Sequence, residues 1–176
     1  MVWRRLFIVG QTSLATFHQV IQIIYQWDDD HLHQFHIYGQ DYGISYEGGI
    51  AFSHNASKVL LDDFKFDVGD KFTYQYNFFK NHRVDIRIEA IEDTHRNNAP
   101  YCTKGNGIPG VSKYDAIQPT INLLKAFSKF DETRDIGELR SLAEQFNAAN
   151  FNKLYINRLL KTEVMSELLY WGAPSS

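Results

Sequence analysis

KFTYQYNFFKNHRVDIRIEA, residues 71–90, is the stretch that decides the fold class. Its first half places an aromatic residue at every second position from Phe72 to Phe78, and its second half alternates charged with apolar residues from Arg83 to Ala90. Alternate residues of a β-strand lie on opposite faces, so the pattern predicts strands over 71–78 and 82–91, each with one apolar face. Together they predict an antiparallel meander in the middle of the chain.

Further elements flank this meander. The stretch Gln11-Thr12-Ser13 offers a hydroxyl cap for a helix over 13–26, where apolar residues recur at helical spacing. The other predicted elements are strands over 3–9, 31–38, 44–53 and 64–67, a turn at Gly48–Gly49, a loop over 93–113, and helices over 114–130, 135–148 and 151–170. Strands and helices gather in separate parts of the chain, which predicts an α+β fold with the meander packed by the N-terminal helix and the C-terminal helices. We expect a single domain over 1–176, with 114–176 as its helical C-terminal part.

Composition excludes several classes of protein. Of the 176 residues, 44% are apolar and 15% aromatic, so most of the chain has enough apolar material to form a core and is not expected to be disordered. The formal net charge of −3 gives no overall attraction to nucleic acid. Cys102 is the only cysteine, no apolar run is long enough to span a bilayer, and a cytoplasmic location is therefore expected, without membrane association. Strand-like residues begin almost at once, which leaves open that a neighbouring strand comes from another chain.

WDDDHLHQFHIYG, residues 27–39, carries the densest group of candidate ligands. On a regular strand His31 and His33 share one face with Phe35, whereas His36 lies on the other face. Two histidines at this spacing bind a metal ion only with further ligands from elsewhere, and His18, His82 and one of Asp28 to Asp30 are the candidates. The alternative is a pair of histidines hydrogen-bonded at the margin of a sheet.

The remaining patterns are weaker. The aromatic stripe from Phe72 to Phe78 is typical either of a core or of a surface that stacks nucleic-acid bases. The three aspartates follow a helix C-terminus, where the helix dipole disfavours negative charge, so either a functional role or a turn explains them. The sequence contains no nucleophile elbow and no phosphate-binding glycine motif, and no spacing pairs Cys102 with a histidine.

Three segments of the chain resemble a known family. They are Trp3-Arg4-Arg5, then Thr12-Ser13-Leu14 with 17–22 (FHQVIQ), then 27–35 (WDDDHLHQF). This order resembles the plasmid Ri open-reading-frame-three family, also labelled insertion-element passenger proteins of TnpR type, and weaker similarity continues to about residue 160. The resemblance implies a compact α+β fold with a bent antiparallel sheet and an association with plasmids and mobile elements, and it implies no settled activity.

The chain also departs from the family pattern. Where the family reads Y-x-Y-D-F-G-D-x-W-x-H, this chain has 74–84 (YQYNFFKNHRV), so both acids are replaced, by Asn77 and Lys80. A later pattern of cysteines and acids is reduced to 102–105 (CTKG) and Pro109-Gly110. Losing two carboxylates removes general acid–base capacity, while the aromatic and apolar frame remains.

These observations favour a non-catalytic binding or interaction module over an enzyme. No cofactor is expected, and a protein partner or self-association is favoured over nucleic acid. The alternative is a metal-dependent hydrolase or nucleic-acid-processing factor built on His31 and His33, with a divalent metal as its cofactor. A third hypothesis is a basic nucleic-acid-binding patch, made by Arg4, Arg5, Lys80, Arg83 and Arg87.

Overall fold

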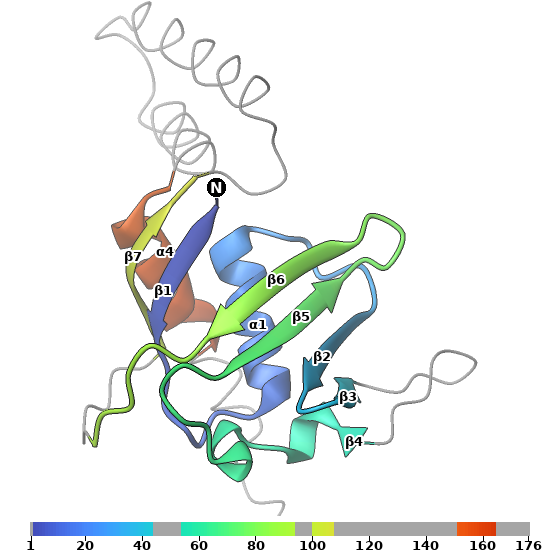
Figure 1. Cartoon of the computed structure of the whole chain (residues 1–176). Helices are drawn as coiled ribbons and strands as arrows, with labels where there is room; N and C mark the ends of the chain where they lie inside the picture. The colour runs from blue at the N-terminus through green and yellow to red at the C-terminus, as the bar shows by residue number, and fades with distance from the viewer. Residues whose placement is uncertain (1, 44–53, 94–99, 108–150, 165–176) are drawn as a thin grey trace, which may run out of the picture. The chain divides into compact units, whose positions relative to one another are not determined.

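The structure, a computed structural model, describes residues 2–43, 54–93, 100–107 and 151–164 (Figure 1). The chain divides into two compact units. The larger unit comprises Ile8–Gln22 and Trp27–Pro100, and the smaller comprises Met1–Phe7, Ile23–Gln26 and Tyr101–Ser176. The predicted helices over 114–130 and 135–148 and the predicted strand over 44–53, with its turn at Gly48–Gly49, lie outside the described residues.

A five-stranded sheet forms the framework of the larger unit. Its strands, in spatial order, are β4 (His54–Asn55), β3 (Gln40–Gly43), β2 (His33–Ile37), β5 (Lys71–Tyr76) and β6 (His82–Arg87). All neighbours pair antiparallel except β3 and β4, which pair parallel. The α+β class is thus confirmed, as are the two strands predicted within 71–91.

The turn between β5 and β6 is built by asparagines. Asn77 and Asn81 both have positive φ, near 51°, a conformation that asparagine tolerates better than most residues. The Asn77 side chain also accepts a hydrogen bond from the Lys80 backbone N–H at 3.1 Å. This turn ends β5 at Tyr76, earlier than the predicted residue 78, and leaves Phe79 fully exposed.

The Leu14–Gln22 part of helix α1 (Leu14–Tyr25) lies against one face of this sheet (Figure 1). The Ser13 hydroxyl accepts a hydrogen bond from the Thr16 N–H at 3.1 Å, so the predicted cap is confirmed. Phe17 stacks on Phe35 of β2 with ring centroids 5.6 Å apart, and both rings are buried. Burying a side chain of this size stabilises the fold by about 1.5–3 kcal/mol.

The connection from β4 to β5 is helical where a strand was predicted. It contains the 3₁₀ turns η1 (Ala56–Lys58) and η2 (Leu61–Phe64), so the strand predicted over 64–67 is wrong. Lys65 has a φ of 49°, which ends η2 and breaks extended structure. The aromatic residues of this segment stack on one another instead. The ring centroid of Phe66 lies 5.2 Å from that of Phe64 and 5.0 Å from that of Phe72.

A two-stranded antiparallel sheet forms the framework of the smaller unit. It pairs β1 (Trp3–Phe7) with β7 (Tyr101–Asn106), and α4 (Lys153–Leu159) continues into the π-helical turn η3 (Leu160–Val164). Residues 101–106 were predicted as loop, and that prediction is wrong. A residue larger than glycine does not fit at position 105, because a Cβ there would lie 2.7 Å from the Phe151 ring and 2.9 Å from the Arg4 side chain. Gly105 therefore marks a place where other side chains approach the backbone of the strand closely.

Arg4 connects several segments of the smaller unit. Its guanidinium donates hydrogen bonds to the carbonyls of Ile24, Asn106 and Gly107 and lies 4.5 Å from the Phe151 ring centre. Burial lowers the pKa of this guanidinium. None of the described helices is long and apolar enough to cross a membrane.

Candidate functional site

The site lies between α1 and β2, where two histidine rings stack. His18 is on the buried face of α1, and His33 is on the face of β2 that also buries Phe35 and Ile37. Their ring centroids are 3.5 Å apart and their planes differ by 10°. His36 lies on the opposite, exposed face, so the prediction that His33 and His36 lie on different faces is confirmed, whereas His31 precedes β2.

Asp29 reaches back to His18 from the turn that follows α1. Its φ of 53° reverses the chain, and its Oδ1 lies 2.7 Å from His18 Nε2. Gln19, one residue after His18, donates to the other carboxylate oxygen at 3.3 Å. His18 is 3% exposed and Asp29 39% exposed, so the carboxylate connects a buried ring to solvent.

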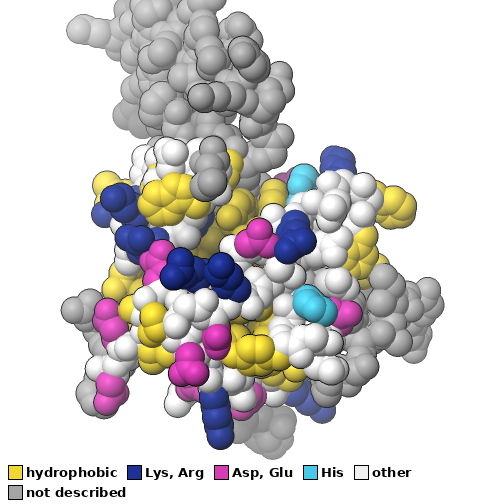
Figure 2. Space-filling view, viewed as in Figure 1, with side chains coloured by type: hydrophobic (Ala, Val, Ile, Leu, Met, Phe, Trp, Pro, Cys, Tyr) yellow, Lys and Arg dark blue, Asp and Glu magenta, His cyan; other side chains and the backbone are white. Residues whose placement is uncertain are grey.

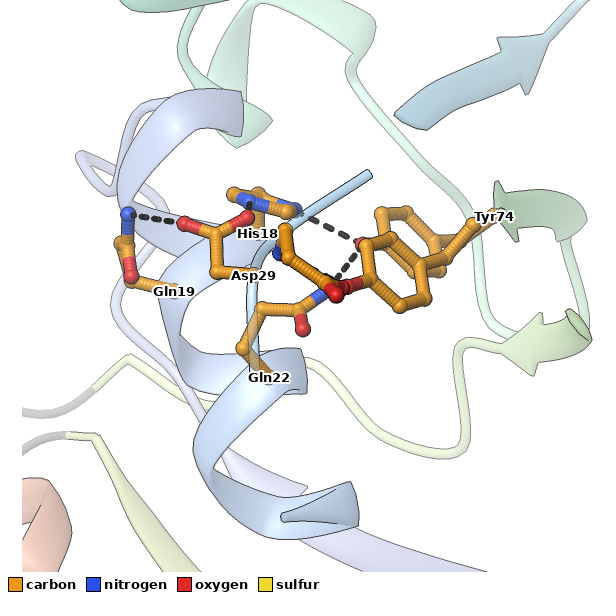
Figure 3. A network of polar contacts seen from close by, with 7 residues as sticks. His18, Gln19, Gln22, Asp29 and Tyr74 are labelled. Atoms are coloured by element: carbon orange, nitrogen blue, oxygen red, sulfur yellow. Dashed lines mark hydrogen bonds and ion pairs between the residues drawn. The ribbon is translucent and has the colours of Figure 1, made fainter. Parts of the chain in front are cut away.

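Tyr74 and Gln22 extend the network into the core. The Tyr74 hydroxyl lies 2.7 Å from His18 Nδ1, and Gln22 Nε2 donates to that hydroxyl at 2.7 Å (Figure 3). Figure 3 shows Tyr74 on the side of the His18 ring away from Asp29. The imidazole is therefore held at both nitrogens, by a carboxylate on the outer side and a phenol on the inner side.

Two buried polar atoms stand out in this cluster. His33 Nε2 and Gln22 Oε1 have no hydrogen-bond partner among the described residues. An unsatisfied buried polar atom costs about 1–3 kcal/mol, so native structures rarely keep one without a role or a partner. Both atoms lie on side chains that are at least 95% buried.

Burial and neighbours set the protonation of the cluster. Burial, with the nearby His18, lowers the pKa of His33 to about 3, so its ring is neutral at pH 7. Burial alone would raise the pKa of the Asp29 carboxyl, but hydrogen bonds from His18 and Gln19 outweigh burial and keep that pKa below its ordinary value. Burial raises the pKa of the Tyr74 hydroxyl, which stays protonated. A neutral imidazole and an ionised carboxylate are the forms that bind metal ions.

His18, Asp29 and His33 together form a candidate metal-binding group. Each offers one ligand atom, and these atoms lie within 4.8 Å of one another. Two imidazoles and a carboxylate are a ligand set that proteins use for Zn²⁺ and Fe²⁺. Among the described residues, this is the group of three or more His, Cys, Asp or Glu side chains that lie close enough together to share one ion.

The other residues predicted for this site do not belong to that group. Asp30 accepts a hydrogen bond from the Tyr76 hydroxyl at 2.7 Å, and His31 lies 3.6 Å from Asp30. His82 stacks on Trp27 with ring centroids 5.2 Å apart, and Asp28 is exposed. Sequence reasoning missed Tyr74 and Gln22. The available signal was Gln22 four residues after His18 on a helix, because residues at that spacing share a face.

The basic residues predicted for nucleic-acid binding are divided between the two units of the chain. Arg83 pairs with Asp85 at 2.9 Å, and Figure 2 shows basic and acidic side chains interspersed on the face in view. Arg4 is occupied by carbonyls of its own unit, and Arg5 belongs to that smaller unit, whereas Lys80, Arg83 and Arg87 belong to the larger unit. The aromatic stripe of β5 is core, since Phe72, Tyr74 and Tyr76 are buried.

Comparison with known proteins gives the family. The model of the plasmid pRiA4b ORF-3-like protein family matches residues 1–154. The chain belongs to this family. A solved structure, described as a protein of unknown function from Methanosarcina mazei Go1, is similar in fold with a TM-score of 0.53 and 21% identity, over 81% of this chain and 80% of that one. No curated protein matches the chain.

The structure also places the two residues at which the sequence departs from the resemblance. Asn77 and Lys80 lie in the turn after β5, where the Asn77 side chain accepts a hydrogen bond from the Lys80 N–H. Neither belongs to the His18–Asp29–His33 group. The turn that carries Asn77 and Lys80 is therefore separate from the candidate ligands.

Proposed function

We propose that this pRiA4b ORF-3-like protein is a binding module for a divalent transition-metal ion, held by His18, Asp29 and His33. The observation that carries the proposal is the buried, unpartnered Nε2 of His33 beside a second histidine and a carboxylate. A bound ion would supply the missing partner for that nitrogen. It would also compensate the negative charge of Asp29 next to a buried ring.

Binding requires the His33 side chain to move. An imidazole nitrogen binds a metal ion in the plane of its ring, at about 2.0–2.1 Å from zinc. Two rings stacked face to face at 3.5 Å cannot both direct a lone pair at one ion. Because Tyr74 and Asp29 hold His18 at both nitrogens while His33 Nε2 has no described partner, we expect the His33 ring to turn.

The test is a zinc titration of chelator-treated protein, followed by calorimetry and by metal analysis after dialysis. The proposal expects about one equivalent of Zn²⁺ per chain, as for a site with a single ion. His33→Phe removes the candidate ligand but keeps an aromatic ring in the core, and it should abolish this binding.

His36→Ala is the matched control, because His36 is on the same strand but the opposite face. It should bind zinc like the wild type. Wild-type protein that takes up no zinc, or a His33→Phe variant that binds as well as the wild type, would contradict the proposal.

A second candidate function is metal-dependent hydrolysis. The supporting observation is the 39% exposure of Asp29, which leaves one side of the ligand group open to solvent. Three protein ligands with a water in the fourth position are typical of catalytic zinc, and the ion lowers the pKa of that water. Hydrolysis of a phosphodiester or ester substrate by zinc-loaded protein, lost in His33→Phe, would favour this function over simple binding.

The plasmid association of the family is the context of the proposal. We propose that the module acts in a plasmid or mobile-element setting and works with a protein partner or a second copy of itself. Size measurement by light scattering with and without Zn²⁺ tests whether the ion changes self-association.

A further inference from the structure

We infer that Tyr74 and Gln22 are positioning residues for the metal site proposed above, and that their hydrogen bonds reverse direction when the ion binds. The inference rests on the proposed function, because it concerns how His18 is held toward the ion. Both side chains are buried beneath His18, and neither belongs to the candidate ligand group.

The direction of each hydrogen bond follows from the ionised carboxylate. Asp29 can only accept, so His18 Nε2 donates to it, and a neutral His18 ring then accepts at Nδ1 from the Tyr74 hydroxyl. Gln22 Nε2 then donates to the Tyr74 oxygen. In this arrangement every contact has one donor, and Gln22 Oε1 is left without a partner.

Metal binding at His18 Nε2 reverses the chain of donors. The ion needs the lone pair of Nε2, so the single proton of the neutral ring must reside on Nδ1, where it is donated to the Tyr74 oxygen. The Tyr74 proton must then find another acceptor. Gln22 Oε1 supplies it if the amide turns by half a turn about its last bond. No proton is gained or lost by His18, Tyr74 or Gln22.

This reversal gives the unpartnered Gln22 oxygen a role. An amide can present either a donor or an acceptor at one position, which a carboxylate or an ammonium group cannot do. A hydrogen bond from the second nitrogen of a ligating histidine fixes the ring and its tautomer, and losing that bond typically weakens metal affinity by roughly 10- to 100-fold. Tyr74 stands where such a bond forms, 2.7 Å from His18 Nδ1.

The first arm of the test compares two tyrosine variants in zinc titrations of the full chain. Tyr74→Phe removes the hydroxyl that faces His18. Tyr76→Phe makes the same change two residues further along β5, at a hydroxyl that contacts Asp30 instead. We expect Tyr74→Phe to weaken zinc affinity by roughly 10- to 100-fold and Tyr76→Phe by less than about twofold.

The second arm observes the wild type, so it does not depend on a variant that folds. Nitrogen-15 NMR of the histidine rings reports which nitrogen carries the proton. We expect His18 to be protonated on Nε2 after chelator treatment and on Nδ1 with saturating Zn²⁺.

Gln22→Met tests the amide itself, because methionine cannot donate or accept as an amide does. It should weaken zinc affinity, as Tyr74→Phe does.

The outcomes separate this inference from the proposed function. Zinc bound equally by wild type and Tyr74→Phe, equal losses in both tyrosine variants, or a His18 proton that stays on Nε2 with zinc would overturn the positioning role alone. Wild-type protein without any zinc uptake would overturn the metal site and this inference together.

Discussion

Two histidine–aspartate pairs in the larger unit have the same length and different surroundings. His18 and Asp29 lie 2.7 Å apart, and so do His36 and Asp41. The first histidine is 3% exposed, whereas both members of the second pair are 52% exposed. An exposed pair is screened by water and is worth about 0–1 kcal/mol. The distance between histidine and aspartate therefore does not distinguish the two pairs. The burial of the histidine and the side chains that contact it do.

The origin of each pair explains the difference. His36 and Asp41 face each other across the β2–β3 hairpin, so pairing of neighbouring strands brings them together on the outer face. His18 and Asp29 meet only because α1 packs on the sheet and the following turn reverses. Only this pair connects to Tyr74, Gln22 and His33.

The largest expected effect is on acid stability. In the unfolded chain His33 is protonated below about pH 6.5, but in the folded chain only below a pKa of about 3. Between these pH values the unfolded state binds more protons than the folded state, so acid favours unfolding. The contribution of His33 is fully present above pH 6.5 and is lost as pH falls toward 3, by about 5 kcal/mol in total. Urea unfolding in chelator at several pH values measures the slope.

His33→Phe removes the titrating ring and should flatten that slope, while His36→Gln should leave it unchanged. An equal slope in wild type and His33→Phe would mean that the buried ring does not control acid stability.

Truncating the two histidines at pH 7 should have unequal costs. His18→Ala removes one hydrogen-bond partner each from the Tyr74 hydroxyl and the Asp29 carboxylate and opens a cavity, which should destabilise the chelator-treated protein by about 3 kcal/mol. His36→Ala should cost less than about 1 kcal/mol. Urea midpoints compare them directly, and equal losses would erase the contrast between the buried and the exposed pair.

Neutralising the two aspartates tests the charge separately from the contact. Asp29→Asn keeps an oxygen that can accept from His18 but removes the charge, so we expect a stability loss of about 1–2 kcal/mol and much weaker zinc binding. Stability is followed by urea unfolding and zinc binding by calorimetry. Zinc affinity at the wild-type level in Asp29→Asn would remove Asp29 from the ligand set.

Asp41→Asn should have the smallest effect. The pair it breaks is exposed on both sides, so the free energy of unfolding should change by less than about 0.5 kcal/mol, with zinc binding unchanged. Thermal melts at low and high salt provide the measurement. A loss above about 1 kcal/mol that persists in high salt would show that the outer pair is more than a screened surface contact.

Local periodicity was sufficient to predict much of the fold. Alternation over 71–90 predicted β5 and β6, helical spacing predicted α1, and period two assigned His33 and His36 to opposite faces of β2. These features follow from each segment's own residues. The single-domain prediction and the helical character of most of 114–176 stay predictions.

The rest depended on contacts between distant segments. The segment of β7 was predicted as loop partly because it contains Gly105. The need for glycine there comes from Phe151 and Arg4, which are distant in sequence and could not be seen in the local pattern. The ligand group differed from the one expected around His31 because the side chain selected, Asp29, depends on a turn with positive φ. No periodic pattern encodes that reversal.

The order of strands in the larger sheet has a consequence for the protein in a crowded solution. Strand β6 is the last of the five described strands, and its outward side chains are Arg83, Asp85 and Arg87. A fibril stacks identical strands in register, and here each charge would lie against its own copy. The alternating charges on β6 therefore oppose fibril growth, while the apolar residues between them lie half-buried on the other face.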